Sequence, residues 1–407
     1  MAVVRRREGD QAARPLEPAA GVAPQPQRPL DLVQIDHTPI DLIVVDESAR
    51  EPVGRPYLTL AIDVFSRCVV GMVVTLEAPS ATSVGLCLAH AVTDKRPWLE
   101  RLGIEADWPM TGRPRAIHLD NAPEFHSEAL RRGCEQYGIE RHYRPPGEPH
   151  FGGVIERLVG TAMGMVHELP GTTFSNPQER GSYDSEAAAS LTLTELERWL
   201  ALAIAGPYHQ MVHGTLGEPP AARWADGVAR HGAPATVSNP KAFLIDFLPV
   251  IRRTIRRTGF VIDHVTYYAD VLKYLIARRD RLGRFVIRRD PRDLSRVWVL
   301  DPEGSCYVEI PYRTLSHPAV TLWEHRRAVA RLRERGQARV DEAALFRAIE
   351  QMRAITATAA KERRRARRDG ARRAHLPADA PLQRHEAPET ADGTDASARP
   401  FDEIEEW

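Results

Sequence analysis

The chain has 407 residues, and its 55 basic and 55 acidic side chains give a formal net charge of zero. This length allows two or three domains with a sizeable core, and zero net charge means that any DNA affinity must come from separate basic regions. The four cysteines form no Cys-x-x-Cys pair, which indicates neither a zinc site nor a disulfide framework and is typical of a protein in a reducing cytosol. The sequence has no run of 18 apolar residues, and we expect neither a membrane-spanning helix nor a signal peptide.

Residues 1–29 are rich in Arg, Ala and Pro, and we expect them to be disordered. The apolar run at 32–35 predicts a buried strand that ends at Asp36 and continues toward a second apolar run. Further elements are expected in chain order: strands over 57–64 and 68–76, a helix over 81–94, a strand over 116–119, a helix over 127–137, a strand over 139–144 and a helix over 154–165. The order βββαβαβα predicts an α/β fold with a mixed sheet and helices on its faces.

Three acidic residues lie at the ends of these elements. Asp36 and Asp120 each follow an apolar strand, and Glu156 opens a helix after the pair Gly152-Gly153. Carboxylates packed together repel each other unless a cation intervenes, and Mg²⁺ prefers oxygen ligands. Two such ions clamp the attacking and leaving oxygens of an in-line displacement. The pattern therefore favours metal-dependent phosphodiester chemistry over a set of solvated surface acids.

With these motifs in place, the sequence resembles the DDE transposases and retroviral integrases of the ribonuclease H-like superfamily, in the TniA-type and phage Mu-type branch. The resemblance covers about residues 30–320, with a further match at the extreme C terminus, and it rests on four segments: 33–38, 118–125, 149–157 and 166–172. It implies that Asp36, Asp120 and Glu156 bind two Mg²⁺ or Mn²⁺ ions. Water would first cut at a transposon end, and the freed 3′-hydroxyl would then attack a target DNA strand.

The chain departs from this family in two ways. Ala122 stands where the family often has Gly, and a positive φ there would strain alanine by about 1 kcal/mol or more. Family members usually carry helix-turn-helix domains ahead of the core, which suggests a chain shortened at its N terminus. Three hypotheses stay open: an active DNA strand transferase assembled as a multimer on DNA, a catalytically idle regulator that binds DNA or a partner ATPase, and a general metal-dependent nuclease.

Polar residues beside the carboxylates are candidates for contact with DNA, namely Asn121, His150 and Arg157. The alternatives are a structural hydrogen bond for Asn121 and a solvated charge for Arg157. Farther along, His209 and His213 have the i, i+4 spacing of a helical metal pair, but no third ligand of suitable type lies nearby. We therefore favour a structural or DNA-facing role for them over a zinc site.

Residues 240–320 have the character of a small antiparallel β-barrel, with short β-type runs at 245–255, 259–262, 265–268, 285–289 and 297–300. Between residues 251 and 300, 13 Lys and Arg stand against 5 acids, a local net charge of +8. This excess of positive charge favours a barrel that binds the DNA backbone over a soluble barrel with a charged rim. The candidate DNA-binding residues are Arg252, Arg253, Arg256 and Arg257.

The predicted domains are a disordered segment (1–29), an integrase-type core (30–235), a DNA-binding barrel (240–320), a basic helical region (321–375) and a flexible tail (376–407). The tail ends in an acidic and aromatic peptide whose Phe401, Ile404 and Trp407 suit a basic, apolar groove. The resemblance implies that this peptide engages an AAA+ ATPase, and the alternative is an acidic solubility tail. A cytosolic, nucleoid-associated location follows from the expected DNA partner.

Overall fold

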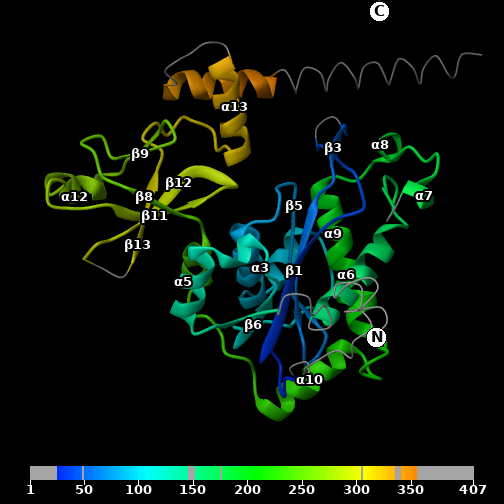
Figure 1. Cartoon of the computed structure of the whole chain (residues 1–407). Helices are drawn as coiled ribbons and strands as arrows, with labels where there is room; N and C mark the ends of the chain where they lie inside the picture. Colours follow the sequence, from blue (N-terminus) through cyan, green and yellow to red (C-terminus); the bar gives the residue numbers. More distant parts are fainter. Residues whose placement is uncertain are drawn as a thin grey trace, which may run out of the picture. The chain divides into compact units, whose positions relative to one another are not determined.

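The structure is a computed structural model that describes residues 25–47, 50–144, 152–174, 177–303, 306–334 and 341–354 (Figure 1). His150 and the peptide at 401–407 lie outside these described residues, and so does the predicted helix beyond residue 354. The described chain contains two large hydrophobic clusters, one running from Leu30 to Phe247 and one from Ile255 to Ile349.

A five-stranded mixed sheet forms the centre of the first cluster. Its order is β5-β4-β1-β6-β7, and β1 is antiparallel to β4 but parallel to β6. The strands are β1 (Leu32–Pro39), β4 (Tyr57–Asp63), β5 (Val69–Thr75), β6 (Ala116–Leu119) and β7 (Glu140–Tyr143). Val33 and Ile35 of β1 are fully buried because helices cover both faces of the sheet. Sequence and structure therefore agree on a mixed α/β sheet.

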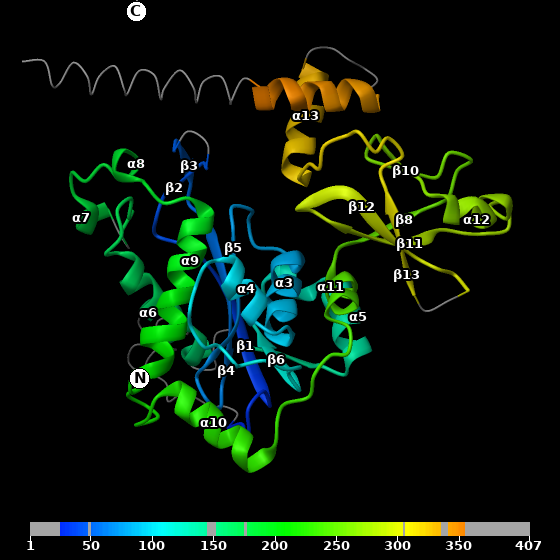
Figure 2. The ribbon, with the colours of Figure 1, turned by 180° about the vertical axis from the view of Figure 1, so that it is seen from behind.

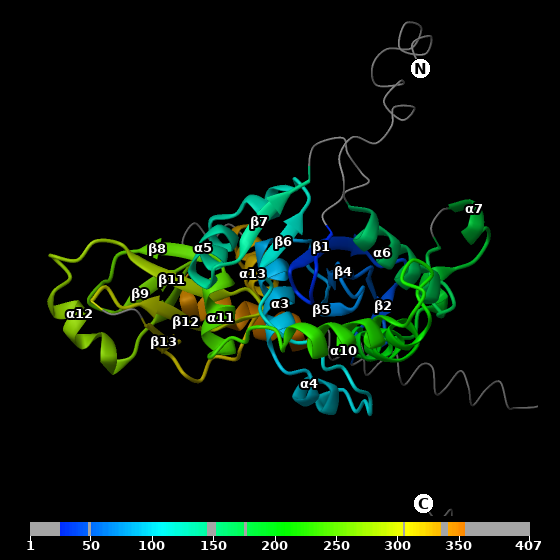
Figure 3. The same cartoon turned by 90° about the horizontal axis from the view of Figure 1, so that it is seen from below.

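Four helices follow the predicted places: α3 (Ala81–Val92), α5 (Glu128–Tyr137), α6 (Gly153–Val166) and α9 (Leu193–Ala203). Ser127 caps α5 by accepting a hydrogen bond from the amide of Leu130, as expected. In Figures 1 and 2, α3 and α5 lie on one side of the sheet and α6 and α9 on the other, and Figure 3 shows the sheet from below. The predicted order βββαβαβα is thus confirmed.

Several short elements join this framework. They are β2 (Val44–Val45), β3 (Pro52–Gly54), α4 (Arg96–Arg101), η2 (Pro123–His126), α7 (Pro177–Arg180), α8 (Ser185–Ala188), the π-helical turn η4 (Ile204–Tyr208) and α10 (Pro220–His231). The turn η4 holds Tyr208 and directly precedes a segment that packs toward α6.

The strand predicted over 245–255 is wrong in its first half. Residues up to Phe247 belong to helix α11 (Pro240–Phe247), which Asn239 caps and Pro240 opens. Phe243 and Phe247 lie four residues apart on this helix and are both buried in the first cluster. The helical spacing of two large aromatic residues therefore outweighs the β-type character of the residues between them, and the strand begins only at Val250.

The second cluster is built on an antiparallel sheet of order β13-β12-β11-β8 and a hairpin of β9 and β10. The bounds are β8 (Val250–Arg253), β9 (Phe260–Ile262), β10 (Val265–Tyr267), η5 (Asp270–Leu272), α12 (Lys273–Ala277), β11 (Phe285–Asp290), β12 (Asp293–Leu300), β13 (Tyr307–Pro311) and α13 (Leu322–Glu334). A single bridge between Tyr267 and Tyr312 links the hairpin to the chain after β13. The closed barrel and the domain boundaries remain predictions.

Candidate active site

Asp36 lies within β1, which continues to Pro39 because its backbone goes on pairing with β4, and not at a strand end as predicted, whereas Asp120 directly follows β6. The register of β1 and β6 places Gln34 opposite His118, so Asp36 and Asp120, each two residues further on, follow on the same face. Burial raises the pKa of Asp36, the guanidinium of Arg144 lowers it, and the negative charge of Asp120 raises it, with a net rise. The two carboxylates are therefore close enough to repel each other.

Gln34 connects all three predicted acids. Its side-chain Nε2 donates to His118 Nδ1 at 3.2 Å, and its Oε1 accepts a hydrogen bond from the amide of Ile155 at 3.1 Å. Ile155 directly precedes Glu156 at the start of α6, and His118 lies two residues before Asp120. Only 3% of Gln34 is exposed, so these bonds are made away from water. One buried amide thus ties β1, β6 and the first turn of α6 together.

A positive charge lies against two of the acids. Arg144 follows β7, and its Nη1 and Nη2 both lie 3.3 Å from Asp36 Oδ2. Its Nη1 lies 3.8 Å from Glu156 Oε1, and Arg144 is largely buried whereas about half of Glu156 is exposed. The backbone of Arg144 is held on both sides, since its amide donates to Leu119 and its carbonyl accepts from Asn121 Nδ2 at 2.6 Å. Arg144 is therefore a fixed part of this site.

The glycine pair before α6 leaves room for this arrangement. A Cβ at Gly152 would lie 2.5 Å from Glu156 Oε1 and 2.6 Å from Arg144 Nη1. A side chain at this position would push Glu156 or Arg144 away from the observed contact.

The donor chemistry suits a hard divalent cation. All three predicted acids offer carboxylate oxygens, two of them repel each other, and a guanidinium already balances part of their charge. Within the described ranges, however, no group of three or more His, Cys, Asp or Glu side chains is already clustered as a metal site. Arg144 lies between Asp36 and Glu156 in this arrangement, so a bound ion would compete with its guanidinium.

The flanking residues have local roles in this structure. The side-chain amide of Asn121 donates to the Arg144 carbonyl, which is the structural hydrogen bond that we gave as the alternative to DNA contact. Ala122 has φ −64° and ψ 147°, an ordinary extended conformation, so alanine is not strained there. Its amide donates to Asp120 Oδ1 at 2.9 Å, which closes the turn after β6. Arg157 donates to Thr215 Oγ1 at 3.2 Å from the exposed side of α6.

Part of the basic excess in the second cluster is neutralised internally. Arg252 forms an ion pair with Glu128 of α5 at 2.7 Å, and Arg288 and Arg289 are buried. Three of the four predicted DNA-binding arginines are exposed and make no ion pair within the described ranges, namely Arg253, Arg256 and Arg257. The surface charge available to DNA is therefore smaller than the count along the sequence.

Sequence reasoning missed Gln34 and Arg144. Gln34 had a usable signal, because strand alternation places it on the same face as Asp36. Arg144 had none beyond its place before Pro145-Pro146, since its contact with Asp36 joins residues 108 positions apart.

Comparisons with known proteins agree with the resemblance to DDE transposases that the sequence motifs indicate. Residues 34–171 match the family described as the TnsB C-terminal domain, and residues 245–309 match that described as Mu transposase, C-terminal. The transposase for transposon Tn552 of Staphylococcus aureus is 24% identical over 71% of this chain and 57% of its own length. The Tn7 transposition protein TnsB of Escherichia coli is 29% identical over 40% of this chain and 24% of its own length. The chain thus spans little more than half of the first relative and about a quarter of the second.

Solved structures that match include a simian T-cell lymphotropic virus intasome in complex with PP2A regulatory subunit B56 gamma. It is 15% identical and covers 72% of this chain and 80% of its own, with a TM-score of 0.33. The catalytic core domain of BIV integrase is 17% identical over 49% of this chain and 97% of its own, with a TM-score of 0.29. None of the helices in the described ranges is both long and apolar enough to cross a membrane.

Proposed function

We propose that this chain, a member of the DDE transposase family, cuts DNA at transposon ends and joins the freed 3′-hydroxyl to a target strand. The observation that carries the proposal is the Gln34 network, which joins β1, bearing Asp36, and the end of β6, followed by Asp120, to the helix start bearing Glu156. A structural set of acids has no need of a buried amide that joins all three elements. The family matches support a role in DNA recombination, and the two reaction steps are our proposal.

Asp36, Asp120 and Glu156 would hold two Mg²⁺ or Mn²⁺ ions, with Arg144 giving way at Asp36. When bound, such ions neutralise charge on the reacting phosphate and favour deprotonation of the attacking oxygen. Asp36 and Asp120 have fixed backbones on β1 and at the turn after β6, so they keep their positions as substrate binds. Glu156 is the most exposed of the three and is the one free to move toward the ion.

The proposed joining step is a transesterification at phosphorus. The 3′-oxygen of the transposon end forms a bond to a target phosphorus, and the bond from that phosphorus to the target's own 3′-oxygen breaks. The proton of the attacking hydroxyl passes to solvent, and the leaving 3′-oxygen takes up a proton. The number of phosphodiester bonds is unchanged, so no external energy source is required.

Further parts of the proposal concern partners. Arg253, Arg256 and Arg257 supply backbone contacts to DNA from the second cluster, and the chain acts as a homo-oligomer on DNA in the cytoplasm. The terminal peptide with Phe401, Ile404 and Trp407 binds an AAA+ ATPase through its acidic and aromatic side chains. The match to the Tn7 transposition protein TnsB supports a place in a multi-protein transposition system.

The test is strand transfer by the purified chain with Mg²⁺ and a pre-cut DNA end. Asp120→Asn removes one ligand charge, and Asp226→Asn is a matched control because Asp226 is an exposed residue that pairs with Arg230 on α10. We expect joined product from the wild type and the control, and none from Asp120→Asn.

The alternative is a catalytically idle regulator that binds DNA or the ATPase. The contact of Arg144 with both Asp36 and Glu156 favours it, because a fixed guanidinium occupies part of the cation position. DNA binding without joined product in the wild type would support this alternative and contradict the strand transferase. Product that survives in Asp120→Asn would contradict the proposed site itself.

A further inference from the structure

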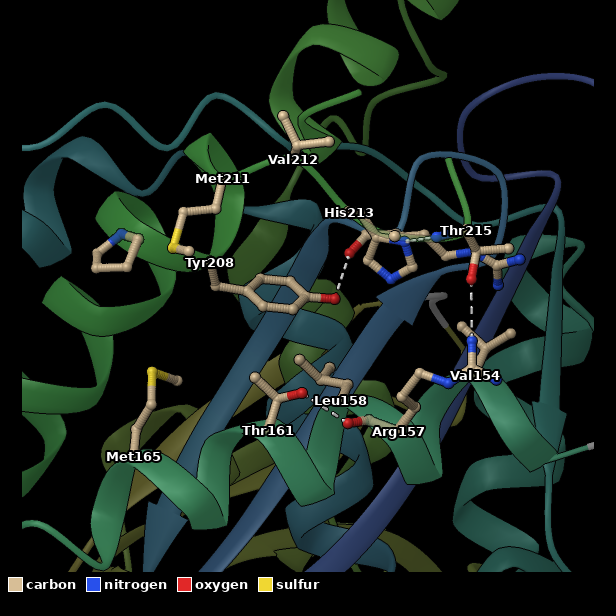
Figure 4. Close-up of a pocket in the computed structure, with 13 residues that line it drawn as sticks. Val154, Arg157, Leu158, Thr161, Met165, Tyr208, Met211, Val212, His213 and Thr215 are labelled. Carbon is tan, nitrogen blue, oxygen red and sulfur yellow. Dashed lines mark hydrogen bonds between the residues drawn. The ribbon is translucent and has the colours of Figure 1, made fainter. Parts of the chain in front are cut away.

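A pocket of about 490 Å³ lies between α6 and the segment after η4. We call it the α6 pocket. Figure 4 looks into it and shows Arg157 and Thr161 of α6 facing Tyr208, His213 and Thr215 on the opposite wall. Arg157 directly follows Glu156 in the sequence, so Arg157 at the edge of the α6 pocket lies next to Glu156 on the helix surface, although Glu156 itself does not line the pocket.

The α6 pocket gathers positive charge, and among the nearby acids only buried Asp63, outside the lining, acts on Arg67 within the described residues. Arg67, Arg157 and His213 line it, and none of its lining residues, all in the described part of the chain, is Asp or Glu. Burial first, and then the charges of Arg67 and Arg157, lower the pKa of His213. Burial also lowers the pKa of Arg67, and the charge of Arg157 adds to that effect. Like charges brought together in this way favour an anion between them.

Arg67 is held in place at some energetic cost. Its φ of 66° is in the left-handed region, which non-glycine residues rarely adopt. The turn is locked by buried Asp63, whose Oδ2 accepts from the amide and the hydroxyl of Ser66 at 3.0 and 2.6 Å. The carbonyl of Arg67 accepts from the Tyr208 hydroxyl at 2.9 Å.

This fixed guanidinium is incompletely used within the protein. Nη1 of Arg67 is buried and has no hydrogen-bond partner among the described residues. A buried, charged donor without an acceptor costs free energy, and strain of this kind gathers at functional sites. A ligand oxygen would supply the missing acceptor.

The mouth of the α6 pocket is apolar on one side. Met211 and Val212 are 66% and 68% exposed, which is unusual for large aliphatic side chains beside a charged cluster. A ligand that suits both walls carries an anionic group next to an apolar, ring-shaped body. A nucleotide unit has this combination, with its phosphate next to its sugar.

We propose that the α6 pocket binds one backbone phosphate of a DNA strand that passes over Glu156. Arg67 and Arg157 donate to its oxygens, and Met211 and Val212 pack against the adjoining sugar. The inference rests on the proposed function, because a strand held at the carboxylates continues along α6 past Arg157. An acidic peptide has the same charge but no reason to be placed beside Glu156.

The experiment measures binding of a labelled transposon-end duplex by full-length protein across a series of potassium chloride concentrations. The variants are Arg157→Gln, at an exposed position, and the double variant Arg67→Gln/Arg157→Gln. Arg230→Gln is the matched control, since Arg230 is an exposed helix arginine outside the α6 pocket. We expect the double variant to bind about tenfold more weakly and the slope of log affinity against log salt to fall by about 1.

A second readout locates the phosphate. Ethylation of single backbone phosphates should weaken wild-type binding at one position near the cut end, and that position should lose its effect in the double variant. If the variants match Arg230→Gln in affinity, slope and interference, the inference fails while the proposed function stands. If the wild type binds no DNA, both fail. If the double variant loses binding of a synthetic 401–407 peptide but keeps its DNA affinity, the α6 pocket binds an acidic peptide instead.

Discussion

Replacing Gln34 with leucine should separate the geometry of the candidate active site from DNA binding. Leucine has a similar size, so the space between β1, β6 and α6 stays filled. The change removes the acceptor for the Ile155 amide and the donor to His118 Nδ1. His118 is buried and neutral, because burial, followed by the charge of Arg144, lowers its pKa to about 4. It therefore accepts at Nδ1 and carries its proton on Nε2.

The magnitude follows from these two lost partners. Ile155 is fully buried, and an unsatisfied buried amide costs about 1–3 kcal/mol. Loss of the bond to His118 adds about 1 kcal/mol, so the free energy of unfolding should fall by about 2–4 kcal/mol. The first turn of α6, which carries Glu156, then loses its fixed position against β1, and a misplacement of about 1 Å costs about 100-fold in rate.

The assay compares urea unfolding, duplex binding and strand transfer in Gln34→Leu and in Gln178→Leu, an exposed glutamine on α7. We expect Gln34→Leu to lose stability and about 100-fold in strand transfer while duplex affinity stays within about twofold, since no backbone-binding arginine is touched. Equal stability and equal transfer in the two variants would refute the idea that Gln34 holds the three acids in register.

The other predictions concern charge. Arg144→Gln should raise the affinity of the protein for Mn²⁺ about tenfold in calorimetry, because a guanidinium 3.3 Å from Asp36 competes for its carboxylate. Weaker Mn²⁺ binding in this variant would mean that Arg144 holds the site in shape instead. Burial lowers the pKa of His209 to about 3. Below pH about 6.5 the histidine therefore takes up a proton only in the unfolded state, and the free energy of unfolding falls by about 1.4 kcal/mol per pH unit. His209→Gln should flatten the fall in urea stability between pH 6.5 and 5 by about 2 kcal/mol, and an unchanged slope would contradict this. Charge reversal at Arg253, Arg256 and Arg257 should weaken duplex binding and reduce the slope of log affinity against log salt by about 3. An unaffected slope would place the DNA footprint elsewhere.

Local sequence patterns predicted much of the fold. Apolar alternation, a serine cap and a glycine pair are local signals, and they placed the five core strands, α3, α5 and α6 within a few residues. The same signals failed at α11, where the residues from 245 onward are β-type in character and the Asn-Pro start was overlooked. Local propensity is weak there because the packing of Phe243 and Phe247 against the first cluster decides the conformation.

The charge of the second cluster shows another limit. The count of +8 along 251–300 is correct, but acids outside that stretch neutralise part of it, as Glu128 does for Arg252 and Glu303 does for Arg278. Ion pairs between distant residues depend on tertiary contacts, so a linear count overstates the exposed charge.

By itself, the sequence determined the α/β class, the element order, Asp120 after a strand and Glu156 at a helix start, because hydrophobic period and turn residues are encoded locally, whereas β1 runs on past Asp36 through its pairing with β4. Only the tertiary structure decided that Gln34 joins those three elements, that Arg144 lies among the acids, and that Arg67 faces the α6 pocket with an unpaired donor. Each of these contacts joins residues brought together by sheet pairing and helix packing, and no pattern along the chain records which distant partner a buried polar group will meet.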